Sequence, residues 1–321
     1  MPRAKEVKRR LRFTPDARGR VVLVVAQAAT LLLTWRLWEV RTSPPLLPYI
    51  ALPQLSVGVP LLLSLVLVVW DRRAVYLHAG LLVAALLMDQ TRIQPGPISL
   101  CLLLVATLPR LRALAPAHLA ALWIWGGVHK LLSPDFAILV APGIFGSREL
   151  GLFVAAVEIA LGALIFLRRR RELGMVALAL HGTASVVLLW RGEYALLPWN
   201  VVLAGVYFFI PNERSRILDA VPFLIPAGFY LGIVDAYFAH VLFTGGVTQS
   251  VRCDAQECRS DVEQDEVRQA LGVPLGPEDR LIRTYFRATC YPGEELFVTL
   301  PRTYLHPRRQ SLSEPCPDLS P

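Results

Sequence analysis

Among the ionisable side chains inside apolar stretches of the sequence, three could carry out chemistry together. They are Lys130, Glu158 and His181. Ionisable groups are costly in an apolar interior, so they usually face one another there and often serve a function. A lysine that loses its water shell can act as a general base or as a nucleophile. We therefore expect Lys130 to be the catalytic base, with Glu158 and His181 as partners that orient it or handle its proton.

The same residues also allow alternatives without chemistry. Glu158 and His181 lie at similar distances from the ends of their apolar stretches, so they can meet in a hydrogen bond that only fixes helix packing. Lys130 lies near the end of its stretch, from which a lysine can extend its ammonium group into water. Gly126 and Gly127 favour burial of Lys130, because two glycines let another helix approach closely.

Five more residues are expected to line the same site. Asp89 and Arg92 follow one apolar stretch, His129 directly precedes Lys130, and Trp199 and Asn200 begin a later stretch. All five are expected near the outer face of the membrane, on the same side as one another.

No metal site is expected among these residues. The sequence has no HExxH motif, and it also lacks the GxGxxG, Walker and GxSxG patterns of nucleotide enzymes and serine hydrolases. His78 and His118 are expected to be core histidines with satisfied hydrogen bonds.

The composition indicates a membrane protein. Of 321 residues, 54% are hydrophobic and 18% are charged, and the mean hydropathy is +0.47. A helix needs about 20 apolar residues to cross the hydrocarbon layer. We therefore expect an all-α polytopic membrane helix bundle with about nine transmembrane helices. The expected spans are Val21–Trp38, Ile50–Trp70, Val75–Met88, Pro97–Leu108, Ala113–Leu132, Leu150–Leu167, Leu173–Trp190, Leu197–Ile210 and Val221–Thr244.

Lys and Arg are concentrated in every second loop between these stretches. Loops rich in Lys and Arg stay in the cytoplasm, which predicts a multi-pass protein of a bacterial plasma membrane. Residues 1–20 form its basic cytoplasmic N-terminus, residues 21–245 the membrane bundle and residues 246–321 an extracytoplasmic tail. The tail holds nine Lys or Arg and twelve Asp or Glu, so the net charge of +8 comes from the membrane part. We expect this charge to attract the lipid bilayer and no nucleic acid.

Four of the five cysteines lie in the tail. Cys253, Cys258, Cys290 and Cys316 form an even set in a segment expected outside the cytoplasm, which predicts two disulfides with three possible connectivities. We favour Cys253 with Cys258, and a zinc site is the alternative. Cys101 is expected to be a small buried hydrophobic residue.

The tail is expected to fold as a small α+β cap. The acidic run from Asp261 predicts a short helix that ends before Gly272. Residues 281–289 and 295–300 resemble two strands of a hairpin, separated by a turn at Tyr291-Pro-Gly. The last ten residues are expected to be disordered.

A series of motifs follows in a characteristic order along the chain. They are the Asp89–Pro95 loop, Gly127–Leu131 with Pro134–Phe136, the helix around Glu158, His181, and Trp199 with Asn200. Together they resemble the HTTM (horizontally transferred transmembrane) family, which includes the membrane domain of vitamin K-dependent gamma-glutamyl carboxylase. The resemblance covers roughly residues 70–211. It implies that Lys130 matches the catalytic lysine of the carboxylase and His181 the family's helical histidine.

The resemblance also implies a chemistry. In the carboxylase a base deprotonates a quinol, so a lipid-soluble quinone or quinol is the implied cofactor. The sequence departs from the family at residues 94–97, which contain no histidine, and at Ala184, where an asparagine is expected. The large lumenal part of the carboxylase is replaced by the small tail. The resemblance therefore implies the fold and a reactive lysine rather than peptide carboxylation.

Three functions follow from these observations. The first is a membrane enzyme that uses Lys130 as general base on a quinol or another lipid-soluble substrate near the outer leaflet. The second is a non-catalytic protein resembling DoxX and MauE, which would aid thiol or quinone redox chemistry or the assembly of a partner. The third is a transporter, which the lack of internal repeats and of paired broken helices disfavours.

Overall fold

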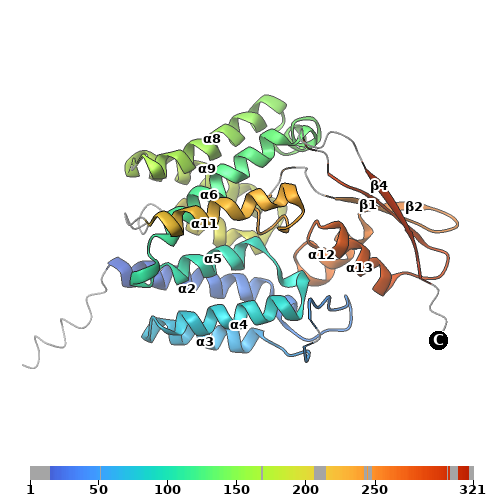
Figure 1. Ribbon diagram of the computed structural model, residues 1–321, viewed down its shortest axis with the longest axis horizontal. Coiled ribbons are helices and arrows are strands. Elements are labelled where there is room, and N and C mark those ends of the chain that lie inside the picture. Colours follow the sequence, from blue (N-terminus) through green and yellow to red (C-terminus); the bar gives the residue numbers. More distant parts are fainter. Residues whose placement is uncertain are drawn as a thin grey trace, which may run out of the picture.

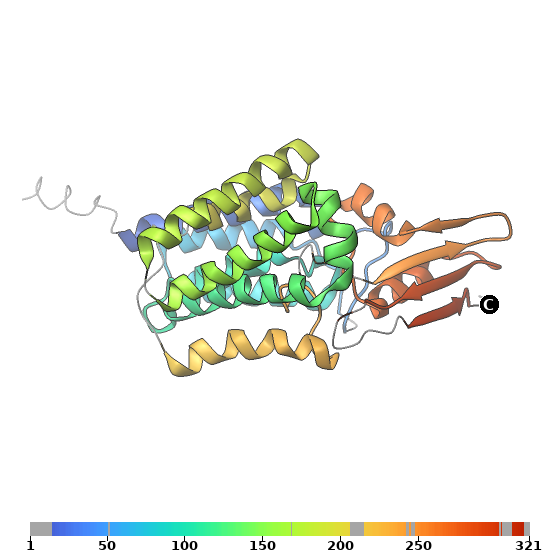
Figure 2. The same ribbon diagram turned by 90° about the horizontal axis from the view of Figure 1, so that it is seen from above.

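The computed structural model describes residues 15–50, 52–167, 169–205, 215–241, 244, 248–301, 303 and 310–317. Residues 1–14 of the expected basic N-terminus and residues 206–214 lie outside the described residues. A set of helices lies side by side with roughly aligned axes, and a small unit of strands and two helices lies at one end of them (Figures 1 and 2). We call this unit, which comprises the described residues from 248 to 317, the cap.

The helices of the larger part differ widely in length. Several are interrupted by short helical turns, among them η1 (Trp35–Trp38), η2 (Gln90–Arg92), η4 (Phe136–Val140) and η7 (Gly228–Leu231). The α-helices are α2 (Pro15–Leu33), α3 (Gly58–Trp70), α4 (Ala74–Met88), α5 (Pro95–Val105), α6 (Leu114–Leu132), α7 (Ala141–Phe145), α8 (Arg148–Phe166), α9 (Arg170–Arg191), α10 (Leu197–Ala204) and α11 (Arg216–Ala227).

The expectation of an all-α bundle with nine membrane spans is wrong. Within the described residues, only α8 and residues Arg171–Arg191 of α9 are long and apolar enough to cross a membrane. A third span exists if α5 and Pro109–Leu132, which meet at an angle of 114°, count as one. The protein also contains a four-stranded antiparallel sheet. A count of apolar stretches overestimated the number of spans, because it measured apolar length and not the length of unbroken helix.

Two of the expected spans show why the helices are shorter than the apolar stretches. Residues 52–57 of the stretch from Ile50 are not helical and α3 begins only at Gly58, so it has 13 residues. The stretch from Val221 contains Pro222 and Pro226, and its helix ends at Ala227. Proline removes a backbone donor and clashes with the preceding helical turn, which shortens helices in this way. Residues 242–243, at the end of this expected span, lie outside the described residues.

The two long helices expose much apolar surface. Only 28% of the apolar window of α8 and 22% of that of α9 are buried within the protein. Phe153 on α8 and Leu178, Val186 and Trp190 on α9 are all exposed. A soluble monomer seldom exposes large contiguous apolar patches, so this surface suits contact with lipid.

Helices α6 and α8 approach each other so closely that two glycines of the interface leave no space for a side chain. A Cβ atom built on Gly127 would lie 2.4 Å from the carbonyl oxygen of Ala155, and one built on Gly162 would lie 2.8 Å from that of Ala120. Both distances are too short for a side chain. The close helix approach predicted from the glycine pair is therefore confirmed, with Gly127 as the contact residue.

The cap combines a sheet with two helices. Its elements are β1 (Gln249–Cys253), β2 (Cys258–Ser260), α12 (Val262–Leu271), α13 (Asp279–Thr289), β3 (Glu295–Thr299) and β4 (Ser311–Pro315). The strand order is β2-β1-β3-β4 and all neighbouring strands are antiparallel. In the register, Val251 of β1 lies opposite Phe297 of β3. The α+β nature expected for the cap is found.

One helix and one strand of the cap were predicted correctly. Helix α12 ends before Gly272, whose φ of +73° is easily reached only by glycine. Strand β3 occupies the second predicted strand. The first predicted strand, residues 281–289, is wrong, because this segment forms α13. Its apolar residues Leu281, Ile282, Tyr285 and Phe286 are all buried and share one face of a helix.

Two further expectations for the tail are corrected by the fold. The turn at Tyr291-Pro-Gly connects α13 to β3 and does not close a hairpin of two strands. The last ten residues contain part of β4, so the expectation that all of them are disordered is wrong. Strand β4 is held by pairing with β3, a long-range contact that the local sequence does not reveal.

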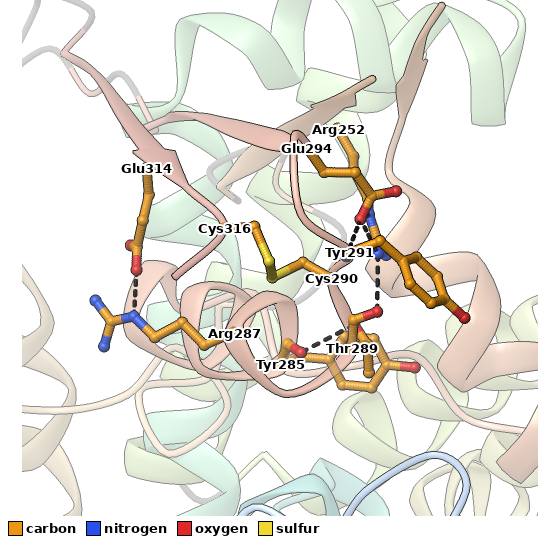
Figure 3. The surroundings of a disulfide bond; sticks show 9 residues. All are labelled: Arg252, Tyr285, Arg287, Thr289, Cys290, Tyr291, Glu294, Glu314 and Cys316. Atoms are coloured by element: carbon orange, nitrogen blue, oxygen red, sulfur yellow. Dashed lines mark hydrogen bonds and ion pairs between the residues drawn. A yellow bond between two sulfur atoms is a disulfide. The ribbon is translucent and has the colours of Figure 1, made fainter. Parts of the chain in front are cut away.

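The four tail cysteines form two disulfides. Cys253 is bonded to Cys258, as predicted, and Cys290 to Cys316. Cys290 and Cys316 are both buried and join the end of α13 to the end of β4, between the ion pairs Arg252–Glu294 and Arg287–Glu314 (Figure 3). Cys101 is buried and free, as expected. Within the described residues no group of three or more His, Cys, Asp or Glu side chains could hold a metal ion.

Candidate functional site

Lys130 and Glu158 form a buried ion pair between α6 and α8. The Nζ atom of Lys130 donates to both carboxylate oxygens of Glu158, at 2.6 Å to Oε2 and 2.9 Å to Oε1. The side chain of Lys130 is 5% exposed and that of Glu158 is 17% exposed. Nζ also lies 3.4 Å from the carbonyl oxygen of Gly126. The close approach at Gly127 brings the two charged side chains together from helices that are otherwise apolar.

His181 on α9 has a fixed tautomer. The indole nitrogen of Trp123 can only donate, and it donates to Nε2 of His181 at 2.8 Å. Nδ1 therefore carries the hydrogen and donates to Oδ1 of Asn200 at 3.0 Å. The amide nitrogen of Asn200 donates to the carbonyl oxygen of Leu196 at 3.1 Å, which sets the orientation of its amide group.

The predicted hydrogen bond between Glu158 and His181 is not formed. Glu158 is paired with Lys130, and His181 is bonded to Trp123 and Asn200. His181 nevertheless lies within electrostatic range of the Lys130 charge. Helices α6, α8, α9 and α10 thus place Lys130, Glu158, His181 and Asn200 in one region of the protein, which we call the lysine site.

His129 is adjacent to Lys130 in the sequence but has other partners. Its Nε2 lies 2.8 Å from the carbonyl oxygen of Ala239, which can only accept. The hydrogen is therefore on Nε2, and Nδ1 accepts from the hydroxyl of Tyr230 at 2.7 Å. Both bonds tie His129 to the segment that follows α11. Within the described residues, the hydrogen bonds of the His129 ring thus lead to Tyr230 and Ala239 and not to Lys130, Glu158 or His181.

Asp89 and Arg92 form a separate buried cluster. Asp89 accepts from Arg41 at 2.5 Å and from the backbone nitrogens of Leu47 and Thr91. The guanidinium of Arg92 donates to three backbone carbonyls, those of Leu37, Glu39 and Ala85. These contacts hold η2 against the segment after α2. Within the described residues, the hydrogen bonds and ion pairs of Asp89 and Arg92 join loops of the helical part and do not reach the lysine site.

Trp199 belongs to a third group of polar residues. Its indole nitrogen donates to the hydroxyl of Ser99 at 3.0 Å, and this hydroxyl lies 2.8 Å from Nε2 of His118. His78 is likewise fully buried, bonded to Ser64 at 2.8 Å and to Gln27 at 3.3 Å. Both histidines are core residues with hydrogen-bond partners, as expected.

The sequence did not point to every residue of these groups. Trp123 and Arg41 are essential partners of His181 and Asp89, yet neither was singled out. Trp123 could have been found from its position two turns before Lys130 on the same helix. Arg41 lies in an irregular loop, so no local pattern links it to Asp89.

The lysine site has the chemistry of a proton-exchanging pair. A Lys–Glu pair can exist as ammonium and carboxylate, or as neutral amine and carboxylic acid, with the same net charge. In this site Nζ of Lys130 lies within hydrogen-bond distance of both carboxylate oxygens of Glu158, so the geometry suits proton transfer between the two groups.

No protein-family model, no curated protein and no solved structure matches the chain. The class that the fold and the site define is thus a helical protein with two helices able to cross a membrane, a disulfide-bonded α+β cap and a buried lysine–glutamate pair.

Proposed function

We propose that the protein is a membrane enzyme in which Lys130 acts as general base on a lipid-soluble weak acid, with a quinol as the expected substrate class. The observation that carries the proposal is the buried ion pair of Lys130 with Glu158. Structural ion pairs occur in proteins, but burying an ion pair between two apolar helices removes both charges from water and is costly. A role in proton transfer accounts for its presence.

Each residue has a role in this reaction. Glu158 takes one proton from the Lys130 ammonium, and the neutral amine of Lys130 then takes the hydroxyl proton of the substrate. The new ammonium group stabilises the negative oxygen that forms. His181, fixed by Trp123 and Asn200, presents a neutral imidazole beside this charge. The resemblance to the carboxylase membrane domain supports the same assignment for Lys130 and His181.

The surface of the protein supports a lipid-soluble substrate. Helix α8, which carries Glu158, has only 28% of its apolar window buried within the protein. A substrate dissolved in the hydrocarbon layer can thus approach the pair along α8 without crossing water. Glu158 is the more exposed member of the pair, which agrees with approach from this side.

We also propose an orientation. The two disulfides support a cap in an oxidising compartment outside the cytoplasm, because thiols in the cytoplasm stay reduced. The basic N-terminal residues would then face the cytoplasm of a plasma membrane that α8 and α9 cross.

Retention of small molecules tests the proposal. The full chain is purified in a mild detergent as wild type, Lys130→Met and Glu149→Gln, and bound lipids are identified by mass spectrometry. Glu149 is an exposed acid at the start of α8 and serves as the matched control. We expect a quinone in the wild type and in Glu149→Gln, and its loss in Lys130→Met. Identical lipids in all three proteins would overturn the proposal and favour a non-catalytic role.

A further inference from the structure

The segment after α11 forms a wedge between the cap and α6. It comprises residues 228–241, which begin with η7 and continue as irregular turns. Ala236, Ala239 and Val241 are buried and pack with Phe229 and Val234. We call residues 228–241 the wedge.

The wedge contacts α6 at two histidines, His129 through hydrogen bonds and His118 through a ring contact. Tyr230 and the carbonyl oxygen of Ala239 bond to the two ring nitrogens of His129. The ring of His240 lies 5.5 Å from that of His118, measured between centroids. His240 has a φ of +62°, which is unfavourable for a residue with a side chain and is maintained only by surrounding contacts. The wedge is therefore held in place by its neighbours and not by its own backbone preference.

The cap holds the other side of the wedge. Arg280 on α13 forms an ion pair with Asp235 at 2.5 Å, and Oε1 of Glu278 accepts from the backbone nitrogen of Ala236 at 2.9 Å. Arg280 also bonds to Tyr49 and Gln90 of the helical part. Two residues at the start of one cap helix thus connect the cap, the wedge and the loops that precede α3 and follow α4.

Gly276 leaves space for the carboxyl group of Glu278. A Cβ atom built on Gly276 would lie 2.5 Å from Oε2 of Glu278, so a larger residue would displace this group. The groups that face Glu278 are Asp235 and Tyr237 of the wedge and Arg280 at the start of α13. Arg268 and Glu193 lie within electrostatic range of the Tyr237 hydroxyl. The nearest acid, Asp235, makes a second negative charge at Glu278 unfavourable.

We propose that Glu278 is a proton-controlled latch, which holds the cap and the wedge against α6 when it is protonated and loosens them when it loses its proton. The residue next to the wedge contact on α6 is Lys130, so the latch controls the packing of the helix end that carries the lysine site. The inference rests on contacts of the cap and the wedge and does not require the proposed enzyme activity.

The direction of the pH effect follows from the surroundings of Glu278. Burial, and then the charge of Asp235, raise its pKa from 4.5 to about 7. An acid whose pKa is raised by docking binds its proton more tightly in the docked state. The contribution of Glu278 to docking is thus complete below pH 4.5 and is lost as the pH rises to about 7.

Hydrogen exchange of the full chain in detergent tests the latch. The protection of a wedge peptide covering residues 233–241 is measured at pH 5 and pH 8, and each rate is divided by the intrinsic exchange rate at that pH. We expect protection in the wild type to fall by about ten-fold or more between the two values. The peptide of α12 in the same samples reports whether the cap itself stays folded.

Three variants sharpen the test. Glu278→Gln imitates the protonated acid, so we expect high protection at both pH values. Arg280→Gln removes the ion pair with Asp235, so we expect low protection at both. Glu257→Gln changes an exposed acid in the β1–β2 turn and is expected to match the wild type. The latch would be refuted by wild-type protection that does not depend on pH, by an unchanged pH response in Glu278→Gln, or by parallel loss of protection in α12.

Discussion

The lysine–glutamate pair is the residue-scale feature on which the functional account depends. Its two charges compensate each other in surroundings with little water. Removing one partner leaves an unpaired buried charge, whereas removing both leaves a site that apolar side chains can fill.

A double-mutant cycle tests whether the pair is coupled in this way. We expect Lys130→Met and Glu158→Gln each to lower the free energy of unfolding by about 3–5 kcal/mol. The double variant Lys130→Met/Glu158→Gln should be more stable than the sum of the single effects predicts. Unfolding is followed in detergent, with Glu149→Gln as a control of unchanged stability. Additive effects would show that the two charges do not interact.

At the residue scale the sequence pointed to buried polar residues more reliably than to their contacts. Lys130, Glu158, His181 and Asn200 were all singled out, because ionisable and amide groups are conspicuous in apolar stretches. The hydrogen bond expected between Glu158 and His181 is not formed, since helical rise gives the depth of a residue but not the direction that it faces. Asp89 and Arg92 were expected at the same site, but their bonds to Arg41 and to backbone carbonyls place them in a separate cluster.

The contact between α6 and α8 is the element-scale feature that assembles the lysine site. Gly127→Ala would place a methyl group 2.4 Å from the carbonyl oxygen of Ala155, so the helices must separate. We expect this variant to lose stability and to lose any ligand that depends on Lys130. The matched control is Gly182→Ala on α9, where no atom lies within 4 Å of the added Cβ. That change should be neutral or stabilise the helix by up to about 1 kcal/mol. Equal effects of the two changes would contradict the close contact.

The two disulfides of the cap should differ in their contribution to stability. Cys290–Cys316 spans 26 residues and Cys253–Cys258 spans five. The chain-entropy model gives about 3.5 kcal/mol for the longer loop and about 2 kcal/mol for the shorter one. Paired Cys→Ala variants of each bridge are compared by thermal unfolding. A larger loss from the Cys253–Cys258 variant would contradict this order.

Element boundaries show where sequence reasoning reaches its limit. Helix α12 has an acidic first turn and is followed by Gly272, and these two local signals together predict it. Helix α13 was mistaken for a strand, because its Thr, Tyr and Phe residues favour strands while its apolar spacing is helical. Tertiary packing of Leu281, Ile282, Tyr285 and Phe286 against the sheet decides between the two.

At the scale of the whole molecule, the cap and the wedge close one end of the helical part. The cap is joined to it by polar contacts from both of its helices, including Arg268 with Glu193 and Arg280 with Asp235. Composition predicted a membrane protein with a small disulfide-bonded tail. It did not predict how many helices are long enough to cross the membrane, because proline positions and helix breaks set helix length.

Reactivity of Lys130 toward a lipid-soluble electrophile tests the central claim most directly. The chain has three lysines, Lys5, Lys8 and Lys130, so acylation by a long-chain active ester can be assigned by peptide mass spectrometry. We expect the ester to acylate Lys130 in the membrane-embedded protein, because the proposed general base must present its amine to a lipid-soluble substrate. A bound quinone analogue should protect it. Acylation of Lys5 and Lys8 alone, with the Lys130 peptide recovered unmodified, would contradict a reactive lysine and leave the ion pair with a structural role.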